Sequence, residues 1–229
     1  MTMELYWGSG SPFAWRVMLA LEIKKLPYES RLLEFSKGDL KTPEYLKLSP
    51  RGQVPALKDG DFVLWESLAI LAYLDRKQPE PPLFGRSAAE TGAVWRVISE
   101  TVSYLEPACV RMAEAIFFGD AEKMRDDIRE AAGEAKAELA TMEHRLKTAA
   151  WLATDTLSAA DIAVYPIVEM LLRAAAKDAA KPLEFGLLPF ASRYPAVAAW
   201  MDRIRALPGY DRTYPPHWRA AARPSAAAS

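Results

Sequence analysis

Apolar residues in the first eighty positions follow two periods, which together predict alternating strands and helices. Met3 to Trp7 forms a short apolar run typical of a strand, whereas Val17, Ala20 and Leu21 fall at helical spacing on one face. The predicted strands and helices of this segment cover, in order, residues 3–7, 12–22, 28–35, 43–48, 54–65 and 66–79. This βαβαββα order predicts a small α/β domain in which two parallel strands precede an antiparallel hairpin.

The predicted hairpin is the sharpest local signal in this segment. Asp59 and Gly60 separate two apolar runs, which is typical of a tight two-residue turn.

Prolines and a glycine interrupt the pattern over residues 80–87, which we expect to be a linker. Beyond the linker the apolar spacing is almost wholly helical. The main helices are expected at residues 88–118, 121–148, 158–177 and 195–207. The sequence thus predicts an α/β domain over residues 1–79, an all-helical domain over residues 88–219 and a flexible, low-complexity tail over residues 220–229.

Charge and cysteine content narrow the classes of partner. A formal net charge of -1 offers no broad attraction to nucleic acid or to an anionic membrane, so we expect neither partner. The single cysteine, Cys109, excludes an internal disulfide, and only two histidines accompany it, so we expect no metal site. No window reaches the roughly 20 apolar residues that span a bilayer, and the N-terminus lacks a signal pattern. We therefore expect a cytoplasmic protein.

The stretch GSGSP, residues 8–12, leaves two interpretations open. Ser11 precedes Pro12, which is the preferred arrangement at a helix start, so the first interpretation is that Ser11 is only a helix cap. Alternatively, its hydroxyl is catalytic, with Ser9 as a rival two residues earlier. The glycines are too few for a dinucleotide-binding loop. By contrast, Ser158 and Asp161 fit a capping box and are expected to be structural.

Four motifs in a fixed order resemble the cytosolic glutathione transferases over nearly the full chain. They are SPFAWRVMLALEIKKLPYE from Ser11, LKTPEYLKLSPRGQVPAL from Leu40, ESLAILAYL from Glu66 and LSAADIAVYP from Leu157. The resemblance implies a thioredoxin-like N-terminal domain, an all-helical C-terminal domain and a homodimer. Within the family the first motif is similar to the serine classes: it combines the Ser-Pro-Phe of tau-like enzymes with the Trp-Arg-Val of zeta-like ones, and a theta-like class is a further candidate.

The resemblance also implies a glutathione site and its chemistry. Ser11 would donate a hydrogen bond that favours the glutathione thiolate, which then attacks a small hydrophobic electrophile. In the family the Val-Pro pair matched by Val54 and Pro55 is cis, and Val54 binds glutathione through its main chain. The remaining glutathione-binding positions implied by the match are Phe13, Lys41, Gln53, Glu66 and Ser67.

Two further expectations concern the second substrate and an alternative function. Tyr104, Arg111, Met112 and Ala115 lie at helical spacings in one predicted helix, so one stripe could face a second-substrate pocket. The alternative function is a non-catalytic binding or protein-interaction module of the same fold.

Overall fold

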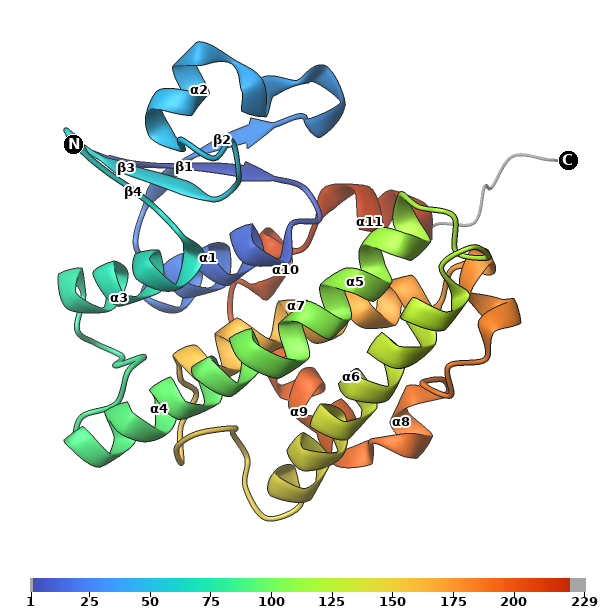
Figure 1. Cartoon of the computed structure of the whole chain (residues 1–229). Coiled ribbons are helices and arrows are strands. Elements are labelled where there is room, and N and C mark those ends of the chain that lie inside the picture. The colour runs from blue at the N-terminus through green and yellow to red at the C-terminus, as the bar shows by residue number, and fades with distance from the viewer. Residues whose placement is uncertain (1, 223–229) are drawn as a thin grey trace, which may run out of the picture. The chain divides into compact units, whose positions relative to one another are not determined.

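The chain forms two compact units, of which the computed structural model describes residues 2–222 (Figure 1). The first unit contains residues up to Pro81 together with those from Leu207 onward, and the second spans Pro82–Ala206. The segment after Leu207 therefore groups with the N-terminal residues, whereas the sequence assigned residues 88–219 to the helical domain. Of the predicted tail, residues 223–229 lie outside the described residues.

A four-stranded sheet organises the first unit, and it confirms the predicted strand directions. Its strands are β1 (Met3–Gly8), β2 (Tyr28–Leu33), β3 (Ala56–Asp59) and β4 (Phe62–Trp65), in the spatial order β2-β1-β3-β4. β1 pairs parallel with β2 and antiparallel with β3, which forms the hairpin with β4. The hairpin turns one residue later than predicted, because Asp59 pairs with Phe62 and Gly60, at a φ of 62°, is the first turn residue.

Helices cover both faces of this sheet. α1 (Pro12–Ile23) and α3 (Ser67–Lys77) lie on one face, and α2 (Pro43–Leu48) lies on the other (Figure 1). Two short 3₁₀ turns, η1 (Phe35–Lys37) and η2 (Asp39–Lys41), precede α2. The predicted apolar face of α1 is fully buried, as are Leu71 and Leu74 of α3. Burial of these helical faces places the starts of α1 and α3 in the same unit.

The second unit is all-helical, as predicted. Its elements are α4 (Ala88–Glu100), η3 (Thr101–Leu105), α5 (Glu106–Phe117), α6 (Arg125–Leu146), α7 (Ala159–Ala175), η4 (Asp178–Leu183), α8 (Phe190–Arg193) and α9 (Pro195–Arg205). α7 is buried along almost all of its length and packs against α4 and α5. None of the helices within residues 2–222 is long and apolar enough to cross a bilayer.

The helix predicted over residues 88–118 contains a turn of π-helix, η3. There the amide of Glu106 donates to the carbonyl of Thr101, five residues back. Pro107 follows directly and has no amide hydrogen for a regular helical bond. The helical turn widens next to the proline, and residues on its two sides lose their common helical register.

Polar side chains join α7 to its neighbours inside the second unit. Asp161 is fully buried and accepts hydrogen bonds from the Ser158 amide and hydroxyl, the Leu152 amide and the Trp200 indole, at 2.9–3.0 Å. The Ser158–Asp161 cap predicted from the sequence thus extends to α9, which carries Trp200.

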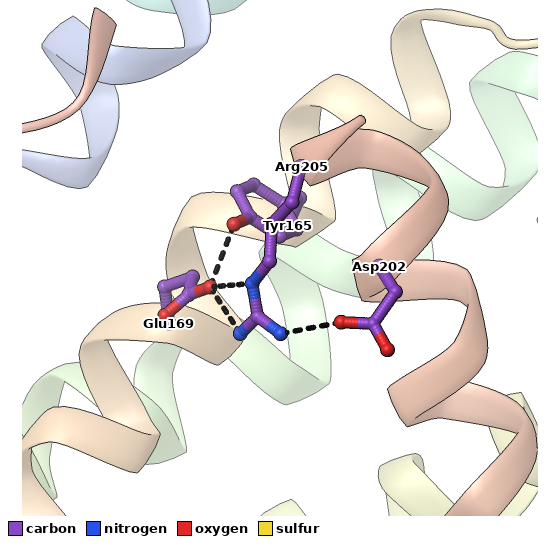
Figure 2. Close-up of polar contacts among 4 residues, drawn as sticks. All are labelled: Tyr165, Glu169, Asp202 and Arg205. Atoms are coloured by element: carbon purple, nitrogen blue, oxygen red, sulfur yellow. Dashed lines mark hydrogen bonds and ion pairs between the residues drawn. The ribbon is translucent and has the colours of Figure 1, made fainter. Parts of the chain in front are cut away.

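A second group of polar contacts ties α7 to the end of α9 (Figure 2). Glu169 accepts hydrogen bonds from Tyr165 at 2.6 Å and from two nitrogens of Arg205 at 2.7 and 3.1 Å, while Arg205 also reaches Asp202 at 2.8 Å. Burial of the Arg205 guanidinium lowers its pKa, but the charge and hydrogen bond of Glu169, together with Tyr165 and Asp202, outweigh that effect, so the net pKa is raised. Arg205 therefore remains charged at the point where the chain leaves the helical unit.

The C-terminal segment returns to α1 as two short helices, α10 (Tyr210–Thr213) and α11 (Pro216–Ala222). The indole of Trp15 donates to Thr213 at 2.8 Å, and both are buried. Three aromatic rings of the segment surround Trp15 at centroid distances of 5.5–6.0 Å: Tyr210, Tyr214 and Trp218. This apolar packing explains why the segment groups with the first unit.

Candidate functional site

The turn between β1 and α1 positions Ser11 at the start of a helix. The amide of Ser11 donates to the carbonyl of Gly8 at 3.1 Å, and Gly10 has a φ of 88°, which favours glycine. Ser11 is the N-cap of α1, and its Oγ accepts a hydrogen bond from the Ala14 amide at 3.2 Å. Its side chain is only half-buried. Ser11 is thus a helix cap that still faces solvent.

The cap leaves the chemistry of Ser11 intact. A hydroxyl can accept and donate hydrogen bonds at the same time, and the Ala14 contact uses only the acceptor. The hydroxyl proton can therefore be donated to an anion beside the turn. The start of α1 also carries the positive end of the helix dipole, which favours an anion there. The two interpretations that the sequence left open are compatible in this geometry.

The start of α3 forms a second polar site. Ser67 is the first residue of α3 and is buried, and Glu66 before it is exposed with a φ of 70°. A non-glycine residue in this region is strained, and such strain is concentrated at functional sites. The Ser67 hydroxyl and the first amides of α3 together form a donor set suited to a carboxylate.

A buried arginine links the two helix starts. A guanidinium nitrogen of Arg16 lies 3.4 Å from the Ser67 Oγ, and the guanidinium carbon lies 5.1 Å from the centre of the Phe13 ring. Arg16 is about 1% exposed. Sequence reasoning treated this position as part of the first motif only and missed its contact with Ser67. The available signal was a charged residue within the apolar stretch of α1.

Glu66 has a cationic neighbour of its own. A guanidinium nitrogen of Arg51 lies 3.2 Å from the Glu66 carboxylate, and both side chains are more than half exposed. Such an exposed pair contributes little to stability. Arg51 therefore leaves Glu66 able to exchange partners when a ligand cation arrives.

A network beneath the loop before β3 fixes the backbone at Gln53. The Gln53 carbonyl accepts from the Tyr45 hydroxyl at 2.7 Å and from the Ser49 hydroxyl at 2.8 Å. Burial raises the pKa of Tyr45 to about 12, so its hydroxyl stays protonated and can donate. The adjoining Val54–Pro55 bond is cis, as expected from the resemblance. The network holds the main chain next to Val54, while the Gln53 side chain is exposed.

Lys41 lies beside the same loop. It ends η2, and its side chain is exposed. Gly52 has a φ of 62°, and a Cβ there would lie 2.7 Å from the Leu40 carbonyl and 3.5 Å from Lys41 Nζ. Only glycine allows this close approach of the two segments. The structure therefore brings Lys41 next to the loop that carries Gln53 and Val54.

Ser9, the rival of Ser11, has a partner that sequence spacing did not suggest. Its Oγ and His217 Nδ1 are 2.6 Å apart and share a hydrogen bond, although 208 positions separate the two residues. Tyr6, earlier on β1, donates to Glu4 at 3.1 Å and packs against the Tyr45 ring.

The predicted second-substrate stripe does not occur as one exposed surface. Met112 and Ala115 are buried inside the helical unit, whereas Tyr104 is about 60% exposed. Arg111 extends to α6, where it pairs with Glu134 at 2.8 Å. Tyr104 lies in the π-helical turn, which shifts its direction relative to the other three residues on α5.

Comparisons with known proteins identify the same two parts of the chain. The family model described as glutathione S-transferase, N-terminal domain, matches residues 10–77, and the C-terminal domain model matches residues 105–208. Glutathione S-transferase A of Pleuronectes platessa is 32% identical over 225 residues, which cover 94% of this chain and 92% of the relative.

Solved structures of glutathione transferases are similar in fold to nearly the whole chain. A glutathione S-transferase from the Antarctic clam Laternula elliptica superposes with a TM-score of 0.80 at 31% identity, covering 98% of this chain and 96% of that chain. Glutathione transferase URE2P6 of Phanerochaete chrysosporium, solved in complex with oxidized glutathione, has a TM-score of 0.78 at 29% identity, with 96% of each chain covered.

Proposed function

Because this chain belongs to the glutathione S-transferase family and is a glutathione transferase, we propose that Ser11 activates the thiol of bound glutathione. The observation that carries the proposal is the half-exposed Ser11 hydroxyl at the N-terminus of α1, whose oxygen accepts from Ala14 while its proton can be donated. Family membership points to glutathione as the substrate, and the position of the Ser11 hydroxyl supports its role as the hydrogen-bond donor.

The activation follows from acid–base chemistry. A cysteine thiol has a pKa of about 8.5, so it is mostly protonated and weakly nucleophilic at neutral pH. A hydrogen bond donated to sulfur and the positive end of a helix both stabilise the thiolate and lower the pKa of the thiol. Ser11 does not itself attack the substrate. It increases the fraction of glutathione that can attack.

The remaining polar groups are proposed to hold glutathione by its charged ends. Ser67 and the first amides of α3 bind the γ-glutamyl carboxylate, and Glu66 binds the neighbouring ammonium. Lys41, supported by Gln53, binds the glycyl carboxylate. The main chain of Val54 pairs with the cysteinyl part, which explains why the Tyr45 and Ser49 hydroxyls fix this loop.

The proposed second substrate is a small hydrophobic electrophile. With an aryl chloride, the thiolate sulfur forms a bond to the ring carbon, the carbon–chlorine bond breaks and chloride leaves with the electron pair. The thiol proton has already passed to solvent, so the atoms balance. We place this activity in the cytoplasm and in a homodimer, and a monomeric mass by light scattering would contradict the dimer. The relatives are transferases, and no observation favours the non-catalytic module.

Substitution of Ser11 by alanine separates catalysis from capping. We expect Ser11→Ala to raise the pKa of bound glutathione towards its free value and to lower kcat/KM by roughly 100-fold, because a donor to the reacting anion is lost. Ultraviolet titration of the bound thiolate and steady-state kinetics with chlorodinitrobenzene measure both effects.

Ser87→Ala is the matched control. Ser87 caps α4 in the same way, with its Oγ accepting from the Glu90 amide at 3.2 Å, but in the helical unit. Both substitutions remove a helix cap, which costs about 1 kcal/mol of stability. Only Ser11→Ala should change the thiolate titration. If the thiolate titrates alike in the two variants and both still bind glutathione, Ser11 is only a structural cap.

A further inference from the structure

His217, near the C-terminus, contacts the turn that carries the catalytic serine. It lies in α11, which belongs to the same compact unit as β1 and α1. Its Nδ1 shares the 2.6 Å hydrogen bond with Ser9 Oγ. Its ring also lies against Gly10, since a Cβ at Gly10 would be 2.9 Å from His217 Cε1. One imidazole thus touches both residues that precede Ser11.

The contact is held in place by the apolar anchor of the C-terminal segment. Trp218, the next residue, is buried against Trp15 with ring centres 5.5 Å apart, and Trp15 donates to Thr213. Trp15 lies on α1, the helix that Ser11 caps. The segment therefore holds the catalytic helix through Trp15 and the turn before it through His217.

The direction of the Ser11 hydroxyl depends on this turn. The Ser11 amide bonds back to Gly8, so Ser9 and Gly10 are the two residues inside the closed turn. Gly10 has no side chain to restrict its backbone, and Ser9 is half-buried. A shift of the order of 1 Å in a catalytic group can greatly reduce a rate. Restraining Ser9 and Gly10 therefore restrains the geometry on which thiolate activation depends.

We propose that His217 is a positioning residue for glutathione activation: through its hydrogen bond to Ser9 and its contact with Gly10 it orients the Ser11 hydroxyl towards the thiol. The C-terminal segment then contributes to the glutathione site as well as to the packing of the first unit. The inference rests on the proposed role of Ser11.

Four variants of the full-length protein test this role. His217→Ala and Ser9→Ala remove the hydrogen bond from either side, and the double variant removes both partners. His217→Asn places an amide near the position of Nδ1 and can keep the bond. His144→Ala is the matched control, because His144 is the other histidine and is exposed on α6 in the helical unit.

We expect variants of His217 and of Ser9 to lose kcat/KM to a similar extent. Each single alanine variant should lower kcat/KM roughly 3- to 10-fold, the usual worth of one hydrogen bond, and raise the pKa of bound glutathione. The double variant should lose no more than the worse single one, since the two residues act as a pair. His217→Asn should recover most of the activity, and His144→Ala should match the wild type in rate and titration.

The outcomes also separate this inference from the proposed function. If Ser11→Ala abolishes the thiolate shift while all His217 and Ser9 variants titrate like the wild type, Ser11 is catalytic and His217 has no positioning role. Additive losses in the double variant, or no recovery in His217→Asn, also overturn the pairing. If Ser11→Ala leaves the thiolate unchanged, the proposed function fails first and this inference fails with it.

Discussion

Ser11 and Asp161 show how differently two capping residues can serve the molecule. Ser11 caps α1 with a half-exposed side chain, so its hydroxyl remains accessible for chemistry. Asp161 is fully buried, and its carboxylate accepts four hydrogen bonds from three residues. Burial raises the pKa of Asp161, against the lowering effect of those bonds. A carboxyl with every oxygen engaged serves folding rather than catalysis.

Removal of Asp161 should therefore destabilise the helical unit strongly. Asp161→Ala leaves the Leu152 amide and the Trp200 indole buried without an acceptor, and each such group costs about 1–3 kcal/mol. We expect a loss of roughly 3 kcal/mol or more in the free energy of unfolding. Urea denaturation measures it. Asp155→Ala, an exposed aspartate in the same loop, should change little; an equal loss in both variants would contradict the account.

Whole elements are joined by groups at their ends. In the first unit, Asp59 at the end of β3 accepts from Tyr73 and Lys77 of α3, at 2.7 and 2.5 Å, and thereby ties the β3–β4 hairpin to that helix. The Phe62 ring packs on Tyr73 across the same junction, with centres 5.0 Å apart. In the second unit, Arg205 and Glu169 join α9 to α7 in the same manner (Figure 2). In each junction, a carboxylate forms an ion pair across the two elements and also accepts a hydrogen bond from a tyrosine hydroxyl.

The hairpin junction should make stability depend on pH. The hydrogen bonds from Lys77 and then Tyr73 lower the pKa of Asp59. A lowered folded-state pKa means that the stabilisation is present above the unfolded value of about 3.9 and is lost as the pH falls through the folded value. We expect Asp59→Asn to cost less than about 1 kcal/mol at pH 7, since the Lys77 partner is exposed and screened.

Urea denaturation at pH 7 and at pH 3 measures this difference. The gap between Asp59→Asn and the wild type should narrow at the lower pH. Asp61→Asn is the matched control, because Asp61 is the next acidic residue of the hairpin and is exposed. If the difference in the free energy of unfolding is the same at both pH values, the charge of Asp59 does not contribute to stability.

At the scale of the whole molecule, the chain crosses from the first unit to the second and back. Residues after Leu207 complete the unit that the N-terminus begins, so the proposed glutathione site draws on both ends of the chain. Arg205 anchors the last helix of the second unit two residues before that return. Among the described residues, 2–81 and 207–222 therefore belong to one compact unit.

Glutathione should stabilise the native protein by mass action. A ligand that binds only the folded state at 100 times its Kd adds about 2.7 kcal/mol to the free energy of unfolding. We expect saturating glutathione to raise Tm in differential scanning calorimetry, and Ser67→Ala to need a higher concentration for the same rise. Cysteinylglycine, which lacks the γ-glutamyl group, is the control ligand. If Tm rises equally for the wild type and Ser67→Ala at every glutathione concentration, Ser67 does not bind glutathione.

The sequence by itself determined the main elements and the family, and it provided the candidate residues of the proposed glutathione site. Apolar periodicity, glycine and proline positions and helix caps are local properties, so they identified the βαβαββα order and the helical domain directly. The cis Val54–Pro55 bond followed from a motif of a few residues. These features were predictable because each depends on residues that are close in the chain.

Only the tertiary structure decided which distant residues meet. The Arg16–Ser67 contact, the hydroxyls beneath Gln53 and the pairing of Ser9 with His217 join segments that packing, not spacing, brings together. The same packing buries Met112 and Ala115, and it places the segment after Leu207 in the first unit. Periodicity shows that a face is apolar, but the partner of that face is chosen by the burial of the whole chain.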